Sequence, residues 1–541
     1  MKKLLGSLLS LALVATVVTG CGGSSRDTST IRVAVGGDCA YLDPAIVDDS
    51  ITANVLNQMY EGLYKLDTNG NVVANVATAK PTISKDGKTY TITLNKGYKW
   101  SDGQALTAKD YVYAWKRAAA MGAATAYYSN FIYNYVTGAG DGSATTMSKL
   151  SNFGAVAKDD YTIQITLKKK CAYFTSLMAN TVFYPVRQSA VEKKGANPLK
   201  STWADATDVP TNGAFTATAI NAKSEIDLAK NDKYHAASEV KIKKISFKVM
   251  SDTDSETSGF QSGELDFATA CNNETIQANS DLKKQVYTVN PFVCNYYILI
   301  NSGDENTNKA LKDVDIRNAL GLAIDKKKVV EASGYGSYAY ALDQFVPKGI
   351  PGATGDYNTE DTTAYSTFNL AEAQKIMKSK GYSASHMLTL TYKYNDLPLH
   401  KDVAQVLQSC LKKAYVNLEL KTEEKETFFA DRDKGNFELA RHAMTADYLD
   451  PMAYLSMYYG NDLAGNTVDD DTYNAMIKKA ETMDGAARMK QLHAAEKYLV
   501  QTKHYIIPLF GYTEPYLKAS ELKGVTSSPE GHYNLTRAYY K

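Results

Sequence analysis

The chain has 541 residues, too many for one hydrophobic core, so two or three domains are expected. Its composition, 44% hydrophobic and 22% charged, is typical of a globular protein that folds in water. The formal net charge is only +1. This balance argues against a large nucleic-acid-binding surface, which requires clustered basic charge.

The N-terminal residues predict secretion. Two lysines precede an apolar run from Leu4 to Val18, which is the layout of a signal peptide over residues 1–20. The run is short compared with the ~20 residues of a membrane-spanning helix. The following Val-Thr-Gly-Cys resembles the bacterial lipoprotein cleavage box, which implies that Cys21 becomes the lipidated N-terminus and that residues 21–30 form a flexible tether. The alternative is an ordinary signal peptide with a chance cysteine.

The mature chain contains five more cysteines, which lie far apart and show no CxxC spacing. A metal ribbon is therefore disfavoured, and a chain of this length does not require a disulfide framework. The spacing leaves one or two disulfides open and does not say which residues would pair. The five are Cys39, Cys171, Cys271, Cys294 and Cys410.

The first third of the mature chain alternates strand and helix patterns. "TIRVAV" predicts a strand, and apolar residues at helical spacing follow it, among them Val55, Met59 and Leu63. A Lys-Asp-Gly turn in "ISKDGKTYTITL" predicts a hairpin. "LTAKDYVYAWKRAAA" predicts an amphipathic helix with Thr107 as its N-cap.

Later segments continue this alternation. "VDIRNALGLAIDKKKVVEA" and "NLAEAQKIMKSKGY" predict helices, the second ending at Gly381. "KETFFADRDKG" predicts a helix that ends at Gly435. Alternating elements of this kind indicate an α/β architecture with mixed sheets.

Signals for catalysis or for a resident cofactor are missing from the sequence. The seven histidines form neither HExxH nor HxH, so a conventional zinc site is poorly supported. There is no GxSxG and no GxxxxGK[ST]. A carboxylate pair for glycoside chemistry stays open, because such pairs leave no spacing signature. We expect no enzyme activity, no cofactor and no metal.

The stretch "NFELARHAMTADY" reads as extended and places two opposite charges on one face. Alternation along a strand puts Arg441, Thr445 and Asp447 on the same side as apolar residues. Buried charges need partners. Either each pairs with a structural residue, or both face a cleft and bind the two ends of one ligand. Six strand residues span at most ~20 Å, which is the size of a short peptide.

Three neighbouring residues have simpler explanations. Asp450 directly precedes Pro451, which is a standard helix start. Arg432 falls near a helix C-terminus, where the helix dipole favours a cation, although arginine also binds carboxylates with a planar fork. His400 begins a predicted helix and, taken alone, is expected at the surface.

Nearly the whole mature chain resembles the oligopeptide-binding proteins of bacterial ABC importers, in the extracellular solute-binding protein family 5. Matching passages include "YTITLNKGYKWSDGQALTAKDYVYAWKRA", "FQSGELDF", "DIRNALGLAIDK" and "TADYLDPMAYL". The resemblance implies a periplasmic-binding-protein-like fold (class II, cluster C) with three domains in two lobes. A hinge would let the lobes close around the ligand.

The resemblance also implies domain bounds. Domain I would comprise three segments, domain II one segment, and domain III, the second lobe, one segment. The expected ranges are 31–62, 199–290 and 506–541 for domain I, 63–198 for domain II and 291–505 for domain III.

Site roles follow from the same resemblance. Asp447 matches the aspartate that pairs with a peptide's α-ammonium, while Arg432, Arg441 and His400 match positions that meet its carboxylate. Ala443 and Thr445 would bond the extended ligand through their backbones, as an added strand does. The remaining matches are Ser50 near Asp48 in the other lobe, Met444 in place of a flanking tryptophan, and Tyr296, Tyr297 and Tyr127 as aromatic lining.

Two departures from the family pattern concern the site. A lysine expected among the carboxylate-binding positions falls near Gly334, and the cysteine that could pair with Cys294 is Thr445. These changes leave recognition of a peptide N-terminus intact and put preferred length in doubt.

The resemblance implies a monomeric, lipid-anchored receptor on the extracytoplasmic face of the cell membrane. It would bind short peptides and deliver them to a membrane-embedded ABC permease with its ATPase subunits. The alternatives are the same fold binding a dipeptide, a signalling peptide, a sugar or a metal chelate, and, from another class, a secreted hydrolase.

Overall fold

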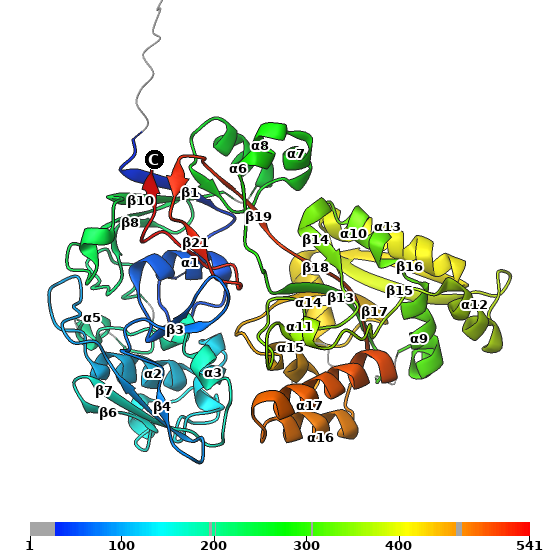
Figure 1. The fold of residues 1–541 in the computed structure, drawn as a ribbon, viewed down its shortest axis with the longest axis horizontal. Coiled ribbons are helices and arrows are strands. Elements are labelled where there is room, and N and C mark those ends of the chain that lie inside the picture. The colour runs from blue at the N-terminus through cyan, green and yellow to red at the C-terminus, as the bar shows by residue number, and fades with distance from the viewer. Residues whose placement is uncertain are drawn as a thin grey trace, which may run out of the picture.

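The computed structural model describes residues 27–39, 41–193, 197–200, 202–250, 252–303, 307–460 and 468–541. These residues form an α/β protein whose two lobes lie side by side (Figure 1). The predicted signal peptide and Cys21 lie outside the described residues. Within the described ranges, no helix is both long and apolar enough to span a bilayer.

The first lobe contains a seven-stranded mixed sheet built from distant parts of the chain. Its order is β12-β19-β11-β1-β10-β9-β8. The predicted first strand is confirmed as β1, which pairs in parallel with β10 and β11 and buries Ile31 and Val33. The strands are β1 (Thr30–Val35), β8 (Phe215–Asn221), β9 (Glu225–Lys230), β10 (Lys244–Val249), β11 (Phe267–Ala268), β12 (Val286–Thr288) and β19 (Pro515–Lys518).

Short helices and paired strands complete this part of the lobe. The helices α6, α7 and α8 lie together at one edge (Figure 1). The elements are α6 (Thr253–Gln261), α7 (Asn273–Ala278), α8 (Ser280–Lys284), β20 (Leu522–Lys523), β21 (Thr526–Ser527), β22 (Tyr533–Asn534) and β23 (Tyr539–Tyr540).

Helix α1 (Ser50–Met59) begins where the Asp49 carboxylate accepts the N–H of Thr52 (2.7 Å). The prediction that the helical pattern continues to Leu63 is wrong. Beyond Met59 the chain is extended, and Tyr64–Leu66 pairs as β2 with β3 (Val72–Ala74). Strand pairing therefore overrides the helical spacing here.

A four-stranded antiparallel sheet, β4-β5-β7-β6, forms the core of the lower part of the first lobe (Figure 1). The predicted hairpin is confirmed, with Gly87 at φ 71° between its strands. The predicted helix after Thr107 is confirmed as α2, and Asp110 accepts the N–H of Thr107 (2.8 Å). The elements are β4 (Thr82–Ile83), β5 (Thr89–Thr93), α2 (Ala108–Met121), α3 (Asn130–Tyr133), β6 (Ala155–Asp159), β7 (Thr162–Thr166), α4 (Phe174–Leu177) and α5 (Gln188–Val191).

The second lobe contains a six-stranded sheet in the order β14-β18-β13-β17-β15-β16. The central strand β13 is buried along its whole length. Two parallel pairings and three antiparallel ones make the sheet mixed, as predicted for the chain. The strands are β13 (Cys294–Ile300), β14 (Ala339–Ala341), β15 (Leu388–Asn395), β16 (Val416–Glu423), β17 (Leu439–Thr445) and β18 (Ile506–Tyr512).

Helices cover this sheet, and most lie where the sequence predicts them. The segment from Val314 to Ala332 divides at Ile324, whose backbone is extended, into α9 and α10. Gly381 and Gly435 follow α12 and α14 with positive φ, as predicted. The helices are α9 (Val314–Ala323), α10 (Lys326–Ala332), α11 (Tyr357–Glu360), α12 (Leu370–Ser379), α13 (Pro398–Lys413), α14 (Lys425–Asp433), α15 (Met452–Leu455), α16 (Asp471–Ala480) and α17 (Gly485–Lys497).

The chain crosses between the large sheets twice, along neighbouring paths. The first crossing lies between β12 and β13, and the second between β18 and β19. β12 pairs with β19 and β13 pairs with β18, so the crossings run side by side. The expected domain bound at residue 506 is wrong, because β18 belongs to the second sheet and the return begins after Tyr512.

The lobes also touch away from these crossings. The ring of Tyr448 stacks on Tyr173 (5.0 Å between centroids), and the N–H of Leu449 donates to the Ser176 hydroxyl (3.2 Å). Lys169 pairs with Glu481 (2.7 Å) on an exposed surface. The segment that follows β17 therefore packs against the first lobe.

Candidate functional site

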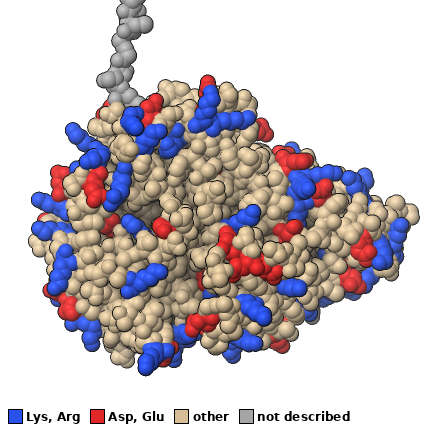
Figure 2. All heavy atoms as spheres, viewed as in Figure 1, with Lys and Arg blue, Asp and Glu red and all other residues tan. Residues whose placement is uncertain are grey.

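A cavity of about 600 Å³ lies between the lobes. The first lobe lines it with Ser50 and Asn54 of α1 and with Tyr128, and the second lobe lines it with Thr445 and Asp447. On the outer face of the protein, Lys and Arg side chains are interspersed with Asp and Glu, and several acidic side chains gather near the centre (Figure 2). That face therefore shows no continuous basic area.

Strand β17 presents an unpaired edge that begins at the cavity. On one side it pairs with β13 over its full length, from Leu439 to Thr445. On the other side it pairs with β15 only at Leu439 and Ala440. Among the described residues, no strand pairs with Arg441–Thr445 on that side. An extended chain could add there as a further strand.

The predicted side-chain alternation holds along β17. Its register with β13 places Arg441, Ala443 and Thr445 on one face and Met444 on the other, where Met444 packs against the larger core. The strand ends at Thr445, so alternation does not extend to Asp447. That residue is placed instead by the turn after the strand, where the N–H of Ala446 donates to the carbonyl of Val293 (3.1 Å).

The carboxylate of Asp447 faces the cavity with one neutral partner. The Tyr128 hydroxyl of the first lobe donates to its Oδ1 (2.8 Å). Within the described chain, no lysine or arginine forms an ion pair with it. Burial raises its pKa to about 6, and the Tyr128 hydrogen bond opposes that shift. Asp447 is thus a half-buried carboxylate that no cation of the described residues neutralises.

Two arginines lie at the end of the unpaired edge that is opposite Asp447. The guanidinium of Arg441, 7% exposed, donates from Nε to Asn395 Oδ1 (2.8 Å) and lies over Phe428 and Phe429. No carboxylate of the described residues pairs with it. Arg432 lies over the same Phe429 ring (4.7 Å) and bonds the neighbouring Asp433 (2.9 Å). Neither arginine lines the 600 Å³ cavity itself.

His400 is buried, and the expectation of a surface histidine is wrong. It is 5% exposed in the first turn of α13, and its Nδ1 lies 3.1 Å from the Tyr296 hydroxyl. Burial, reinforced by Arg441, lowers the pKa of His400 to about 3, so the ring is neutral at pH 7. As a neutral ring it cannot supply charge to a carboxylate, although it remains beside Arg441.

The predicted aromatic lining is only partly provided. Tyr296 stacks on Phe510 (4.9 Å), and Tyr297 points to the opposite face of β13, where it stacks on His442 (5.0 Å). Both rings are almost fully buried in the cores, so neither lines the cavity in this conformation. Tyr127 is 49% exposed and packs edge-on against Tyr128 (5.0 Å), which is the ring that contacts Asp447.

Of the two first-lobe residues predicted for the site, one lines the cavity and the other does not. Ser50 lines the cavity at the first position of α1. Asp48 is exposed and does not line it, whereas the neighbouring Asp49 lines it and is occupied as the helix N-cap.

Asp450 has a structural role, as predicted. Its Oδ1 accepts the N–H of Met452 at the start of α15 (2.9 Å), one residue later than expected because the helix begins at Met452. The sequence did not reveal its second partner. Arg488 of α17 donates to both carboxylate oxygens at 2.7 Å, and both side chains are buried.

The structure adds cavity residues that sequence reasoning missed. Tyr128, Glu514 and Glu530 all line the cavity with Asp447. No motif marks the two glutamates, which stand more than sixty residues after Asp447 in the chain and reach it only through the crossing after β18.

The cysteines form no disulfide among the described residues. Cys294 of β13 is paired in register with Thr445 of β17, and all five described cysteines are free thiols.

The comparisons with known proteins agree with this geometry. Residues 71–466 match the family model of bacterial extracellular solute-binding proteins, family 5, and the chain belongs to this family. It is 30% identical to the dipeptide-binding protein of Lactococcus lactis subsp. cremoris, with 100% of this chain and 99% of the relative covered. It is 28% identical to the oligopeptide-binding protein OppA of Bacillus subtilis, with 99% of each covered.

The fold agrees with a solved relative. The structure of Listeria monocytogenes OppA bound to peptide superposes with a TM-score of 0.75 at 25% identity, covering 95% of this chain and 99% of that one. The expected α/β fold of two-lobed solute-binding proteins is therefore confirmed.

Proposed function

We propose that this protein captures short peptides between its lobes and delivers them to a membrane-embedded ABC permease with its ATPase subunits. The unpaired edge of β17 carries the proposal, because it begins at a half-buried carboxylate, Asp447, and ends at Arg441, which pairs with no carboxylate of the described residues. A peptide has the complementary order of groups, with an ammonium at one end and a carboxylate at the other. Its main chain would bond the backbone from Arg441 to Thr445.

The size of the site supports a short peptide. From Arg441 to Asp447 the chain advances six residues, at most ~20 Å, and each residue of an extended peptide adds ~3.3 Å. The relatives named above are dipeptide- and oligopeptide-binding proteins, and one solved relative holds a peptide. These observations favour a peptide over a sugar, a metal chelate or a hydrolase substrate.

We infer that the protein binds without chemistry and works as a monomer. The lobes would close by rotating about the two neighbouring crossings, at residues 289–293 and 513–514. We propose domain I as residues 31–62, 199–290 and 513–541, domain II as 63–198 and domain III as 291–512. Peptide side chains would lie in hydrated space, which tolerates varied sequences.

The test of this function is calorimetry with a tripeptide, its N-acetylated form and its C-amidated form. We expect the free tripeptide to bind most tightly, because each blocked terminus leaves one charged partner alone. Equal affinity for all three peptides would contradict the proposed roles of Asp447 and Arg441 in binding the two peptide termini. Accumulation of fragments during incubation would contradict the absence of chemistry.

Arg441→Met should weaken the free tripeptide about ten-fold or more, since charge-assisted hydrogen bonds contribute roughly 1.5–3 kcal/mol. The C-amidated peptide should bind wild type and variant with similar affinity, which separates loss of the charge from damage to the strand. An equal loss for both peptides would mean that Arg441 does not meet the carboxylate.

We also propose that Cys21 carries a lipid that holds the protein on the extracytoplasmic face of the membrane. The proposal rests on the signal-like N-terminus and the Val-Thr-Gly-Cys sequence. Cys21→Ser should move the protein from the membrane fraction to the soluble extracytoplasmic fraction and abolish labelling by a fatty-acid probe. Cys271→Ser, which changes a cysteine of the folded part, is the matched control and should stay membrane-bound.

A further inference from the structure

The charged side chains that line the cavity between the lobes are acidic. Among the described residues they are Asp49, Asp447, Glu514 and Glu530, with no lysine or arginine. The single histidine, His532, is neutral at pH 7, because burial lowers its pKa to about 4. A ligand must therefore bring the positive charge into this cavity.

Two of these carboxylates accept no hydrogen bond from the residues that the structure describes. Asp49 caps α1, and Asp447 accepts from Tyr128. Within the described residues, Glu514 has neither a hydrogen bond nor an ion pair. Glu530 lies 3.7 Å from His532, which is uncharged. Both side chains are half-buried at the cavity wall, where a carboxylate that has lost part of its water is stabilised by a positive partner.

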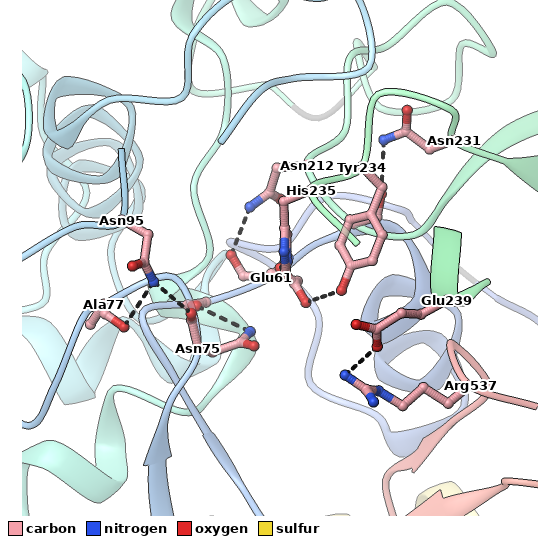
Figure 3. A network of polar contacts seen from close by, with 12 residues as sticks. Glu61, Asn75, Ala77, Asn95, Asn212, Asn231, Tyr234, His235, Glu239 and Arg537 are labelled. Atoms are coloured by element: carbon pink, nitrogen blue, oxygen red, sulfur yellow. Dashed lines mark hydrogen bonds and ion pairs between the residues drawn. The ribbon is translucent and has the colours of Figure 1, made fainter. Parts of the chain in front are cut away.

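A second cavity in the first lobe shows the usual arrangement. It has a volume of about 520 Å³ and includes Glu61 and Glu239 in its lining. Glu61 accepts from the Tyr234 hydroxyl (2.7 Å) and contacts His235 (2.9 Å), and Glu239 pairs with Arg537 (Figure 3). Glu61 and Glu239 are thus satisfied inside the protein, whereas Glu514 is not, and Glu530 lines both cavities.

On the basis of the proposed peptide-binding function, we infer that the receptor selects peptides with a lysine or arginine among their first two residues, whose side chain pairs with Glu530 or Glu514. The α-ammonium neutralises Asp447 alone. The peptide carboxylate is directed to the arginines at the other end of β17, outside the cavity. The second positive charge must then come from a side chain near the N-terminus.

A single metal ion is a poorer partner for these acids. The described residues contain no group of three His, Cys, Asp or Glu side chains placed to hold a metal. The carboxylates are instead distributed over different walls of the cavity: Asp447 follows β17, Glu514 lies between β18 and β19, and Glu530 precedes β22. An extended ligand with separate positive groups fits this distribution.

Binding of such a peptide should release protons. Burial raises the pKa of Glu514 to about 7, and burial with the nearby Asp447 raises the pKa of Glu530 well above its usual value. Below these pKa values the carboxylic acids are neutral and attract a cation weakly. Affinity for lysine-containing peptides should therefore rise with pH between 6 and 8, more steeply than for a neutral analogue.

The test compares Lys-Ala-Ala and Ala-Lys-Ala with the same tripeptides carrying norleucine, which has a similar shape without the ammonium. Calorimetry on the purified protein at pH 7.5 should give at least about ten-fold tighter binding for one lysine peptide over its norleucine partner. In Glu514→Gln/Glu530→Gln this ratio should fall close to one. Glu264→Gln, at an exposed carboxylate of the first lobe, should retain the ratio.

The possible results distinguish a failure of this inference from a failure of the proposed peptide-binding function. If lysine and norleucine peptides bind equally to the wild-type protein, the selectivity is absent and peptide binding stands. If the double variant keeps the preference, other residues provide it and the inference is overturned. If no peptide binds, the proposed function itself fails.

Discussion

Asp447→Asn should weaken binding of a free tripeptide by about 2–5 kcal/mol, because the peptide ammonium is left buried beside a neutral amide. The Tyr128 hydroxyl can still donate to the amide oxygen, so the cavity wall stays in place. Calorimetry at pH 7.5 measures the loss directly. An N-acetylated tripeptide is the control, and its weaker binding should be similar in wild type and variant.

The same substitution should not destabilise the protein without its ligand. Burial raises the pKa of Asp447 to about 6, so in the folded protein its ionised form is unfavourable, and above that pH this costs stability. Asparagine removes the cost, and the thermal midpoint at pH 7.5 should rise or stay unchanged. A large fall in the midpoint would assign Asp447 a structural role and contradict its proposed one.

The raised pKa of Asp447 also sets a pH dependence for all peptide ligands. As pH falls through about 6, Asp447 takes up a proton and loses the charge that holds the ammonium. Wild-type affinity should therefore fall on acidification, whereas Asp447→Asn should show a smaller change over the same range.

For Asp450, three residues after Asp447, we expect a substitution to lower stability and to leave peptide binding in place. Asp450→Ala should lower the free energy of unfolding by about 3–5 kcal/mol, because it leaves the buried guanidinium of Arg488 without its carboxylate partner and removes the acceptor at the start of α15. Urea unfolding with intrinsic fluorescence measures the change. The folded variant should still bind peptide, since Asp450 does not line the cavity.

The double variant Asp450→Ala/Arg488→Met checks the cause. Removing both charges should recover part of the stability, because no buried ion is then left unpaired. Asp160→Ala, which breaks an exposed pair with Lys109, is the matched control and should leave the unfolding midpoint almost unchanged. No recovery in the double variant would locate the effect in the helix start instead of the ion pair.

Sequence patterns predicted those parts of the molecule that depend on neighbours in the chain. The helix start at Thr107, the hairpin around Gly87 and the face shared by Arg441 and Thr445 all follow from residues a few positions apart. The end of α1 was mispredicted because pairing between β2 and β3 competes with helical spacing.

The site was less predictable, because much of it depends on burial and distant contacts. The sequence alone does not indicate that His400 is buried beside Tyr296. Likewise, the surroundings of Asp447 include Tyr128, some 319 residues earlier, and Glu530 from the C-terminal segment. Only the folded chain brings these groups together.

Both large sheets require strands from the last part of the chain, and this has a consequence for the order in which the lobes fold. β18 lies inside the second sheet and β19 inside the first. The buried amide of Gln58 in α1 also has a partner late in the chain, because the N–H of Leu535 donates to its Oε1 (2.9 Å). The second sheet therefore cannot be completed until Tyr512 has emerged from the ribosome, and the first sheet not until Lys518 has. Such long-range pairing is slow, so both lobes should become stable late and nearly together.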